Sequence, residues 1–302
     1  MNTTKKINAT PLVAAVVLAV TLIIEWFAFP PIQKTLGMAG LAISELMILA
    51  IALVAALICK VDLKQMISFR RPKIRQIAGT LIMWVGTFLL VLLVNMVVFY
   101  FFPTGLKVSS ELSDFMTGAP FLVSVLVVSV MPAICEEALH RGFLQTALKN
   151  RITNRKLIML IMGIAFGLFH LSVYRFPGTA ILGAVLAYVL LETENFLYPM
   201  LFHFTNNFVA EVVSYAVSGH QPATTATTLP LISVAAYFIL GAGIPITLLG
   251  GAMLLQGNDK VKAWGKKKIT WSIAGALMLG ILLFAIGVVL MGILISKGEL
   301  KA

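Results

Sequence analysis

Nine segments of this chain are apolar for long enough, or nearly long enough, to cross a lipid bilayer as a helix. A transmembrane helix needs about 20 apolar residues to cover roughly 30 Å of hydrocarbon. The segments span residues 11–29, 38–59, 77–102, 121–145, 157–173, 180–191, 196–216, 231–255 and 269–295. The sixth has only 12 residues, and we expect a tilted or partly re-entrant helix there. The sequence therefore predicts an all-α fold, a multi-pass bundle of eight to nine transmembrane helices.

The composition of the 302 residues excludes a water-soluble globule. Hydrophobic residues make up 60% of the chain and charged residues 12%, whereas soluble domains carry roughly 25% charged residues. The two cysteines, Cys59 and Cys135, lie in or at the end of apolar runs and provide no disulfide framework. The net charge of +11 does not indicate nucleic-acid binding, because no basic segment is interleaved with aromatic residues as in nucleic-acid modules.

The positions of the basic residues predict the orientation of the chain. Lys and Arg collect in the cytoplasmic loops of membrane proteins. With the N-terminus inside and nine crossings, the inner segments hold 17 of the 23 Lys and Arg residues, beginning with Lys5 and Lys6, and Arg141 lies within a helix. The remaining five, on the outer side, are Lys34, Lys107, Arg175, Lys297 and Lys301. We expect a cell-membrane protein with a cytoplasmic N-terminus, a first helix that is retained rather than cleaved, and basic loops that contact anionic lipid.

The ionisable residues exclude several kinds of intramembrane protease. Asp62, Asp114 and Asp259 all lie in predicted loops, which removes the paired membrane aspartates of an aspartyl protease. Ser218 and His220 fall in an outer loop without a nucleophile turn, and the sequence has no HExxH zinc helix.

The fourth span carries two adjacent carboxylates in an otherwise apolar stretch. Glu137 and Arg141 are four residues apart with the acid first, so they are expected to pair along one helix face. Glu136 points about 100° away and is free to face another helix. His140 lies one turn after Glu136 and is either its hydrogen-bond partner or a histidine at the membrane interface. Pro132 removes a backbone donor and predicts a kink.

Two further polar clusters lie in the fifth and seventh spans. The fifth contains Phe166 and His170, and the seventh contains His203 and Asn207, one turn apart, with Glu211 one turn further. Counted from the inner ends of their spans at 1.5 Å per residue, Glu136, His170 and His203 reach overlapping depths of about 13 to 21 Å. The three clusters are therefore predicted to meet inside the membrane.

Each of these residues also has an interpretation without chemistry. Membrane histidines and asparagines often join helices by hydrogen bonds, and Phe166 is expected to pack beside His170 and orient it. We expect water or a local hydrogen-bond partner to satisfy Glu25 and Glu45, in the first two spans, and Glu211. Only the joint occurrence of the clusters favours a catalytic site.

Taken together, the clusters resemble the motif set of the CPBP family, the CAAX-prenyl-protease and bacteriocin-processing intramembrane endopeptidases, also called the Abi family. The motifs are EExxxR at Glu136, Glu137 and Arg141, FxxxH at Phe166 and His170, and HxxxN at His203 and Asn207. The resemblance covers residues 121–216, about a third of the chain. It implies a membrane protease with a catalytic cavity inside the bilayer, although the family also includes members discussed as immunity or scaffold proteins. On this basis we divide the chain into N-terminal helices (1–118), a catalytic core (119–217) and C-terminal helices (218–302).

Peptide hydrolysis needs an activated water, donors for the oxyanion and a proton for the leaving amine. The resemblance and the residue chemistry assign the activation of the water to Glu136 and His170. They assign the stabilisation of the oxyanion to His203 and Asn207. Glu137, held in place by Arg141, is expected to support these residues. A divalent metal such as zinc, bound by Glu136, His170 and His203, remains open.

The expected partners are membrane lipid and a peptide or lipid-anchored protein substrate, with no nucleic acid. Two alternatives from other classes are a non-enzymatic membrane adaptor and, less favoured, a proton-coupled transporter. The sequence lacks the inverted repeat that many transporters have.

Overall fold

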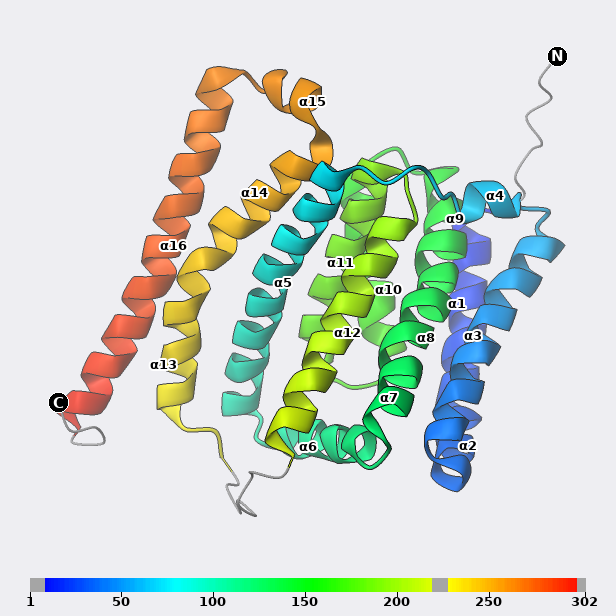
Figure 1. Cartoon of the computed structure of the whole chain (residues 1–302), viewed down its shortest axis with the longest axis horizontal. Coiled ribbons are helices and arrows are strands. Elements are labelled where there is room, and N and C mark those ends of the chain that lie inside the picture. The colour runs from blue at the N-terminus through cyan, green and yellow to red at the C-terminus, as the bar shows by residue number, and fades with distance from the viewer. Residues whose placement is uncertain (1–8, 219–227, 298–302) are drawn as a thin grey trace.

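The structure, a computed structural model, describes residues 9–218 and 228–297, and every regular element in these two ranges is helical (Figure 1). The α-helices that precede the central span are α1 (Pro11–Phe27), α2 (Phe29–Leu36), α3 (Met38–Ile58), α4 (Leu63–Met66), α5 (Ile74–Phe101) and α6 (Thr104–Thr117). The central span consists of α7 (Phe121–Ser124), η1 (Val125–Val130), α8 (Met131–Glu137), η2 (Ala138–Leu144) and α9 (Gln145–Lys149). It is followed by α10 (Arg155–Phe169), α11 (Phe176–Thr193), α12 (Leu197–Val217), α13 (Leu231–Leu240), η3 (Gly241–Gly243), α14 (Ile244–Gln256), α15 (Asn258–Lys262) and α16 (Gly265–Ser296). The all-helical prediction is confirmed.

The helices form a bundle in which the central span lies between α12 and the pair of α1 and α3 (Figure 1). α3 packs against α8 and η2 on one side, and α12 packs against α8 and η1 on the other. α10 and α11 pack along each other, while α16 packs mainly against α13, η3, α14 and α15. α6 lies across the end of the bundle opposite α4 and α15 (Figure 1). This arrangement encloses α8, which carries Glu136 and Glu137, between helices from both halves of the chain.

Six helical segments in the described ranges are long and apolar enough to cross a membrane, or seven if the bent pair α1 and α2 counts as one span. The chain is thus a multi-pass membrane protein. The predicted sixth span, residues 180–191, belongs to the longer α11, whose 18 residues place it among the six. α10 and α12 are not among the six, because α10 has only 15 residues and α12 contains several polar residues. The count of eight to nine crossings therefore remains a prediction.

Close contact between α10 and α11 depends on small residues. A Cβ on Gly163 would lie 2.7 Å from the carbonyl oxygen of Ala180, and one on Gly183 would lie 3.0 Å from that of Met162. Small residues let membrane helices approach closely and gain packing energy that lipid cannot supply. As a result, α11 presents the backbone carbonyls of Gly183 and Ala187 to the side chains of η2 and α9.

The loop before α5 is fastened to the turn before α12. Asn195 accepts a hydrogen bond from the Arg70 amide (3.3 Å) and donates one to the Arg70 carbonyl (3.0 Å). Phe196 N donates to Ser68 O (2.8 Å), and Lys73 N donates to the Tyr198 hydroxyl (2.8 Å). These bonds fix the start of α12, two turns before His203.

Basic residues gather at this end of the bundle, where α4, α9 and α15 lie (Figure 1). Glu192, half-buried near the end of α11, accepts from Arg155 (2.7 Å) and from Lys260 (3.2 Å). Lys5, Lys6, Gly219, His220 and Lys301 lie outside the described residues, and the cytoplasmic N-terminus remains a prediction.

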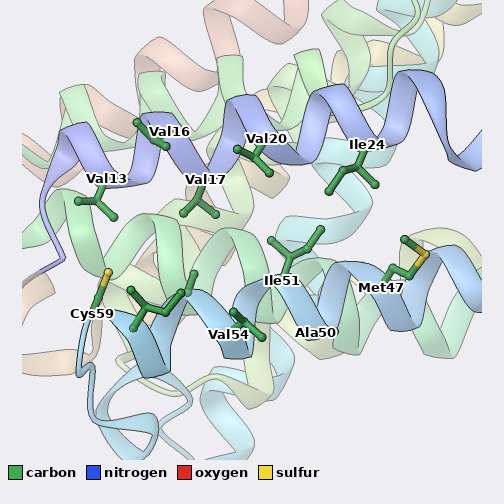
Figure 2. Close-up of a pocket in the computed structure, with 12 residues that line it drawn as sticks. Val13, Val16, Val17, Val20, Ile24, Met47, Ala50, Ile51, Val54 and Cys59 are labelled. Atoms are coloured by element: carbon green, nitrogen blue, oxygen red, sulfur yellow. The ribbon is translucent and has the colours of Figure 1, made fainter.

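A groove of about 460 Å³ runs between α1 and α3 (Figure 2). Its lining is entirely apolar and includes Val13, Val17 and Ile24 from α1 and Met47, Val54 and Cys59 from α3. Glu25 and Glu45 belong to the same two helices but do not line the groove. The groove therefore has the character of a lipid-facing surface, without the polar groups that hydrolysis requires.

Candidate active site

Glu137 is the shared acceptor of the polar cluster. Its Oε1 accepts from Nη1 of Arg141 at 2.9 Å and from Nδ1 of His203 at 2.9 Å. The side chains of Glu137 and Arg141 are completely buried. One carboxylate thus joins the central span to α12.

Arg141 is held by three groups. Besides the ion pair with Glu137, its Nη2 donates to the carbonyl of Gly183 at 2.9 Å, and its guanidinium lies 4.6 Å from the centre of the Phe166 ring. An arginine over an aromatic face gains a cation–π attraction that is strongest where water is excluded. Arg141 therefore fixes the direction of the Glu137 carboxylate.

α8 lies between two π-helical segments, η1 and η2. π-helical turns are rare in proteins and occur often at functional sites. Here they flank the turn that presents Glu136 and Glu137, and Arg141 itself lies within η2.

Glu136 lies beside His203 without touching it directly. Oε2 of Glu136 and Nε2 of His203 are 3.9 Å apart, which is too long for a direct hydrogen bond and suits one bridging water molecule. The Glu136 residue is 8% exposed and His203 is 2% exposed. Within the described residues, Oε2 of Glu136 has no hydrogen-bond partner. The two groups therefore frame a position in which one water molecule could be held and polarised.

His170 ends α10 rather than lying within a span. The predicted fifth span runs to residue 173, but the helix stops at Phe169, and Leu171 adopts a left-handed backbone conformation with φ of 45°. Nδ1 of His170 donates to the carbonyl of Phe166 at 2.8 Å. A neutral ring that donates from Nδ1 leaves Nε2 as an acceptor. The hydrogen bond that the structure gives His170 is thus to the backbone, and its second nitrogen remains available to a ligand.

Phe166 is the packing centre of the site. It is fully buried, and its ring centre lies 4.8 Å from that of His170 and 5.7 Å from that of His203. His140 packs on it at 4.9 Å and donates from Nδ1 to the backbone carbonyl of Glu136 at 2.9 Å. His140 is completely buried in the protein, and its hydrogen-bond partner is the carbonyl of Glu136 rather than the carboxylate. Its depth relative to the membrane interface stays a prediction.

Asn207 binds the backbone of the central span. Its Nδ2 donates to the carbonyl of Val128 in η1 at 3.0 Å, and its Oδ1 accepts from Asn206 at 3.2 Å. An amide nitrogen carries two hydrogens, so one remains for a ligand. One turn further, buried Glu211 is hydrogen-bonded to Ser124, which supplies the local partner expected for it.

Two acids outside the motifs were not assigned to the site from the sequence. Glu25 lies in α1 and Glu45 in α3, and in each the buried Oε2 atom has no hydrogen-bond partner among the described residues. The signal that could have found the two acids is their occurrence in apolar spans, where a charged group is costly.

The donor atoms do not form a metal site. Among residues 9–218 and 228–297, no group of three or more His, Cys, Asp or Glu side chains is arranged to hold a metal ion. The side chains of Glu136, His170 and His203 are therefore not arranged as the zinc site that the sequence left open.

Comparison with known proteins bears on the same part of the chain. Residues 118–209 match the family model of Rce1-like, type II CAAX prenyl endopeptidases. Comparison with curated proteins and with solved structures gave no match. The matched segment, about a third of the chain, contains all three motifs, from Glu136 to Asn207. The resemblance is confirmed over this segment, in which the chain is similar to the Rce1-like endopeptidases of the CPBP family.

Proposed function

We propose that the protein is an intramembrane endopeptidase that hydrolyses a peptide bond in a membrane-associated peptide or a lipid-anchored protein. The observation that carries the proposal is the 3.9 Å separation between Oε2 of Glu136 and Nε2 of His203. Beside this pair, Glu137 and Arg141 are hydrogen-bonded to each other, and Glu137 also accepts from His203. The match to an endopeptidase family over residues 118–209 supports the same reaction class.

In the proposed mechanism Glu136 is the general base. A water molecule between Glu136 and His203 gives its proton to the Glu136 carboxylate, and its oxygen attacks the carbonyl carbon of the scissile bond. The tetrahedral intermediate then collapses, and the proton on Glu136 passes to the departing amine. The products are a carboxylic acid and an amine, so all atoms of the water are accounted for.

Glu137 sets the direction of His203. Because the Glu137 carboxylate can only accept, Nδ1 of His203 donates to it, and the neutral ring turns an acceptor, Nε2, toward the water. If His203 already carries a second proton when the substrate binds, Nε2 donates instead and stabilises the oxyanion together with the remaining N–H of Asn207, and Glu136 alone holds the water. Arg141 acts through Glu137 and is a positioning residue.

His170 is proposed to orient the same water. Its Nδ1 is occupied by the carbonyl of Phe166, so Nε2 can accept a hydrogen bond from the water or from a substrate amide. The ring packing on Phe166 keeps this nitrogen in a fixed direction.

The test replaces the proposed base. Glu136→Gln keeps the shape of the side chain and removes its basicity, and we expect turnover of a membrane-associated peptide to fall by about 10² to 10⁴-fold. Glu211→Gln is the matched control, since it makes the same change at a second buried membrane carboxylate. Both variants are compared in proteoliposomes at equal amounts of inserted protein.

Unchanged turnover in Glu136→Gln would eliminate the mechanism. A non-enzymatic adaptor of the same fold would keep its biological function in this variant, and a proton-coupled transporter would show substrate uptake without cleavage.

A further inference from the structure

The groove between α1 and α3 can take only hydrocarbon. Figure 2 shows its side chains in two facing rows, from Val13 and Cys59 at one end to Ile24 and Met47 at the other. Val54, which also lines it, is 53% exposed, so the groove opens to the outside of the bundle. A polar ligand would lose its hydrogen bonds in such a lining.

The length of the groove corresponds to one leaflet of a bilayer. Val13 and Ile24 are 11 positions apart in α1, which at 1.5 Å per residue places them about 16 Å apart. The hydrocarbon core of a bilayer is about 30 Å thick, so a single leaflet contributes about half of that. A transmembrane helix of a partner would cross both leaflets and extend well beyond the groove. A lipid chain from one leaflet matches its length.

A lysine directly follows one end of the groove. Lys60 comes after Cys59 at the end of α3, and its backbone is left-handed with φ of 53°. Glycine usually takes this position after a helix, because it has no Cβ to be strained. The chain instead carries an exposed cation there. Asp62, the acid nearest in sequence, accepts from the backbone amide of Lys64 (2.9 Å).

Two further cations lie beside the start of α1. Asn150 donates from Nδ2 to the carbonyl of Ala9 at 2.9 Å, and α9, which ends at Lys149, packs against α1. The neighbours of Asn150, Lys149 and Arg151, are therefore held at the end of the groove where α1 begins, and both are exposed. Neither they nor Lys60 form a salt bridge within the described parts of the chain.

We infer that the groove is a binding site for an anionic phospholipid. One acyl chain lies between α1 and α3, and the headgroup phosphate lies among Lys60, Lys149 and Arg151. Basic residues at the membrane surface attract anionic lipid headgroups, and the apolar groove selects a hydrocarbon chain. The lipid would lie beside the helices of the candidate active site, because α3 packs against α8 and α1 packs against η2. The site is independent of whether the protein cleaves peptides.

The experiment titrates the full-length protein in detergent micelles with dioleoyl phosphatidylglycerol or dioleoyl phosphatidylcholine and follows the first bound lipid by native mass spectrometry. Each cation near an anionic headgroup is worth about fivefold in affinity, so we expect phosphatidylglycerol to bind about 25-fold more tightly or better. The double variant Lys60→Gln/Lys149→Gln should reduce this preference to about fivefold or less. The matched control, Lys266→Gln/Lys267→Gln, removes two exposed lysines from the start of α16, across the bundle from α1 (Figure 1), and should retain it.

Filling the groove tests the place of the acyl chain. Val17→Phe in α1 and Val54→Phe in α3 each put a larger side chain into the groove, and each should weaken the binding of phosphatidylglycerol about tenfold. Val289→Phe makes the same change at an exposed position of α16 and should leave the binding unchanged.

Three results would overturn the site. The first is equal binding of the two lipids, or a preference that survives in Lys60→Gln/Lys149→Gln. The second is unchanged binding of phosphatidylglycerol in both groove variants. The third is displacement of phosphatidylglycerol by a lipid-anchored peptide but not by the same peptide without its lipid chain, which would assign the groove to the anchor of a substrate.

Discussion

The buried pair of Glu137 and Arg141 allows the sharpest test of the site. The two side chains are completely buried and joined at 2.9 Å. Glu137→Gln removes the negative charge that balances the guanidinium of Arg141, and the amide oxygen that takes its place is a weaker, neutral acceptor. Breaking one partner of a buried ion pair costs about 3 to 5 kcal/mol, because an uncompensated charge stays in an apolar interior. At about 1.4 kcal/mol for each tenfold change, the equilibrium constant for unfolding should rise by about two to three and a half orders of magnitude.

The double variant separates this cost from the value of the pair. Glu137→Gln combined with Arg141→Met removes both charges and nearly preserves the volume, and such replacements are often close to neutral. We therefore expect the double variant to be more stable than either single variant. Its peptidase activity should still be low, because a neutral amide holds Nδ1 of His203 less firmly than the carboxylate does.

The assay is reversible unfolding in mixed micelles with increasing sodium dodecyl sulfate, followed by circular dichroism, alongside peptide cleavage in proteoliposomes. A loss below about 1 kcal/mol in Glu137→Gln would refute our account of the pair. So would a double variant whose loss equals the sum of the two single losses.

Two further predictions concern the packing of the site and its attachment at the basic end of the bundle. Phe166→Ala should destabilise the protein by about 3 to 5 kcal/mol and lower turnover, whereas Phe166→Leu should have smaller effects on stability and on turnover. Thermal unfolding measures the stability and kcat measures the turnover. Equal effects of the two variants would contradict the role of the ring. Asn195→Ala removes two hydrogen bonds to the backbone of Arg70 and should lower the free energy of unfolding by about 1 to 3 kcal/mol. The amide hydrogen of Arg70 should also exchange faster. Unchanged exchange at Arg70 would show that Asn195 does not hold the loop.

The sequence was a good guide to which segments form helices and a poor guide to where some of them end. Apolar length alone predicted the helices, because a lipid-embedded backbone must satisfy its hydrogen bonds internally. The end of α10 gave no such signal, since Leu171 and Val173, shortly after His170, are apolar as well. The helix stops because the His170 side chain takes the carbonyl of Phe166 and the backbone of Leu171 turns left-handed.

The candidate site was predictable where the partners lie close in sequence. The pairing of Glu137 with Arg141 follows from their spacing of four, and the structure contains it. The hydrogen bond from His203 to Glu137 joins residues 66 positions apart in the sequence. Helical periodicity predicts contacts only within one helix and therefore could not predict this one. The hydrogen bond from Asn207 to the carbonyl of Val128 joins residues 79 positions apart and likewise depends on how helices far apart in the sequence pack.

The attachment of the last helices bears on how the protein is made. α14 meets α5 at Gly251, where a Cβ would lie 2.7 Å from the amide nitrogen of Met83, and Leu255 joins the buried cluster around Tyr198. Ribosomes deliver the chain from its N-terminus, so every residue of the proposed site, from Glu136 to Asn207, is synthesised before α13. The helices α13 to α16 are therefore the last part of the chain that can pack onto the bundle.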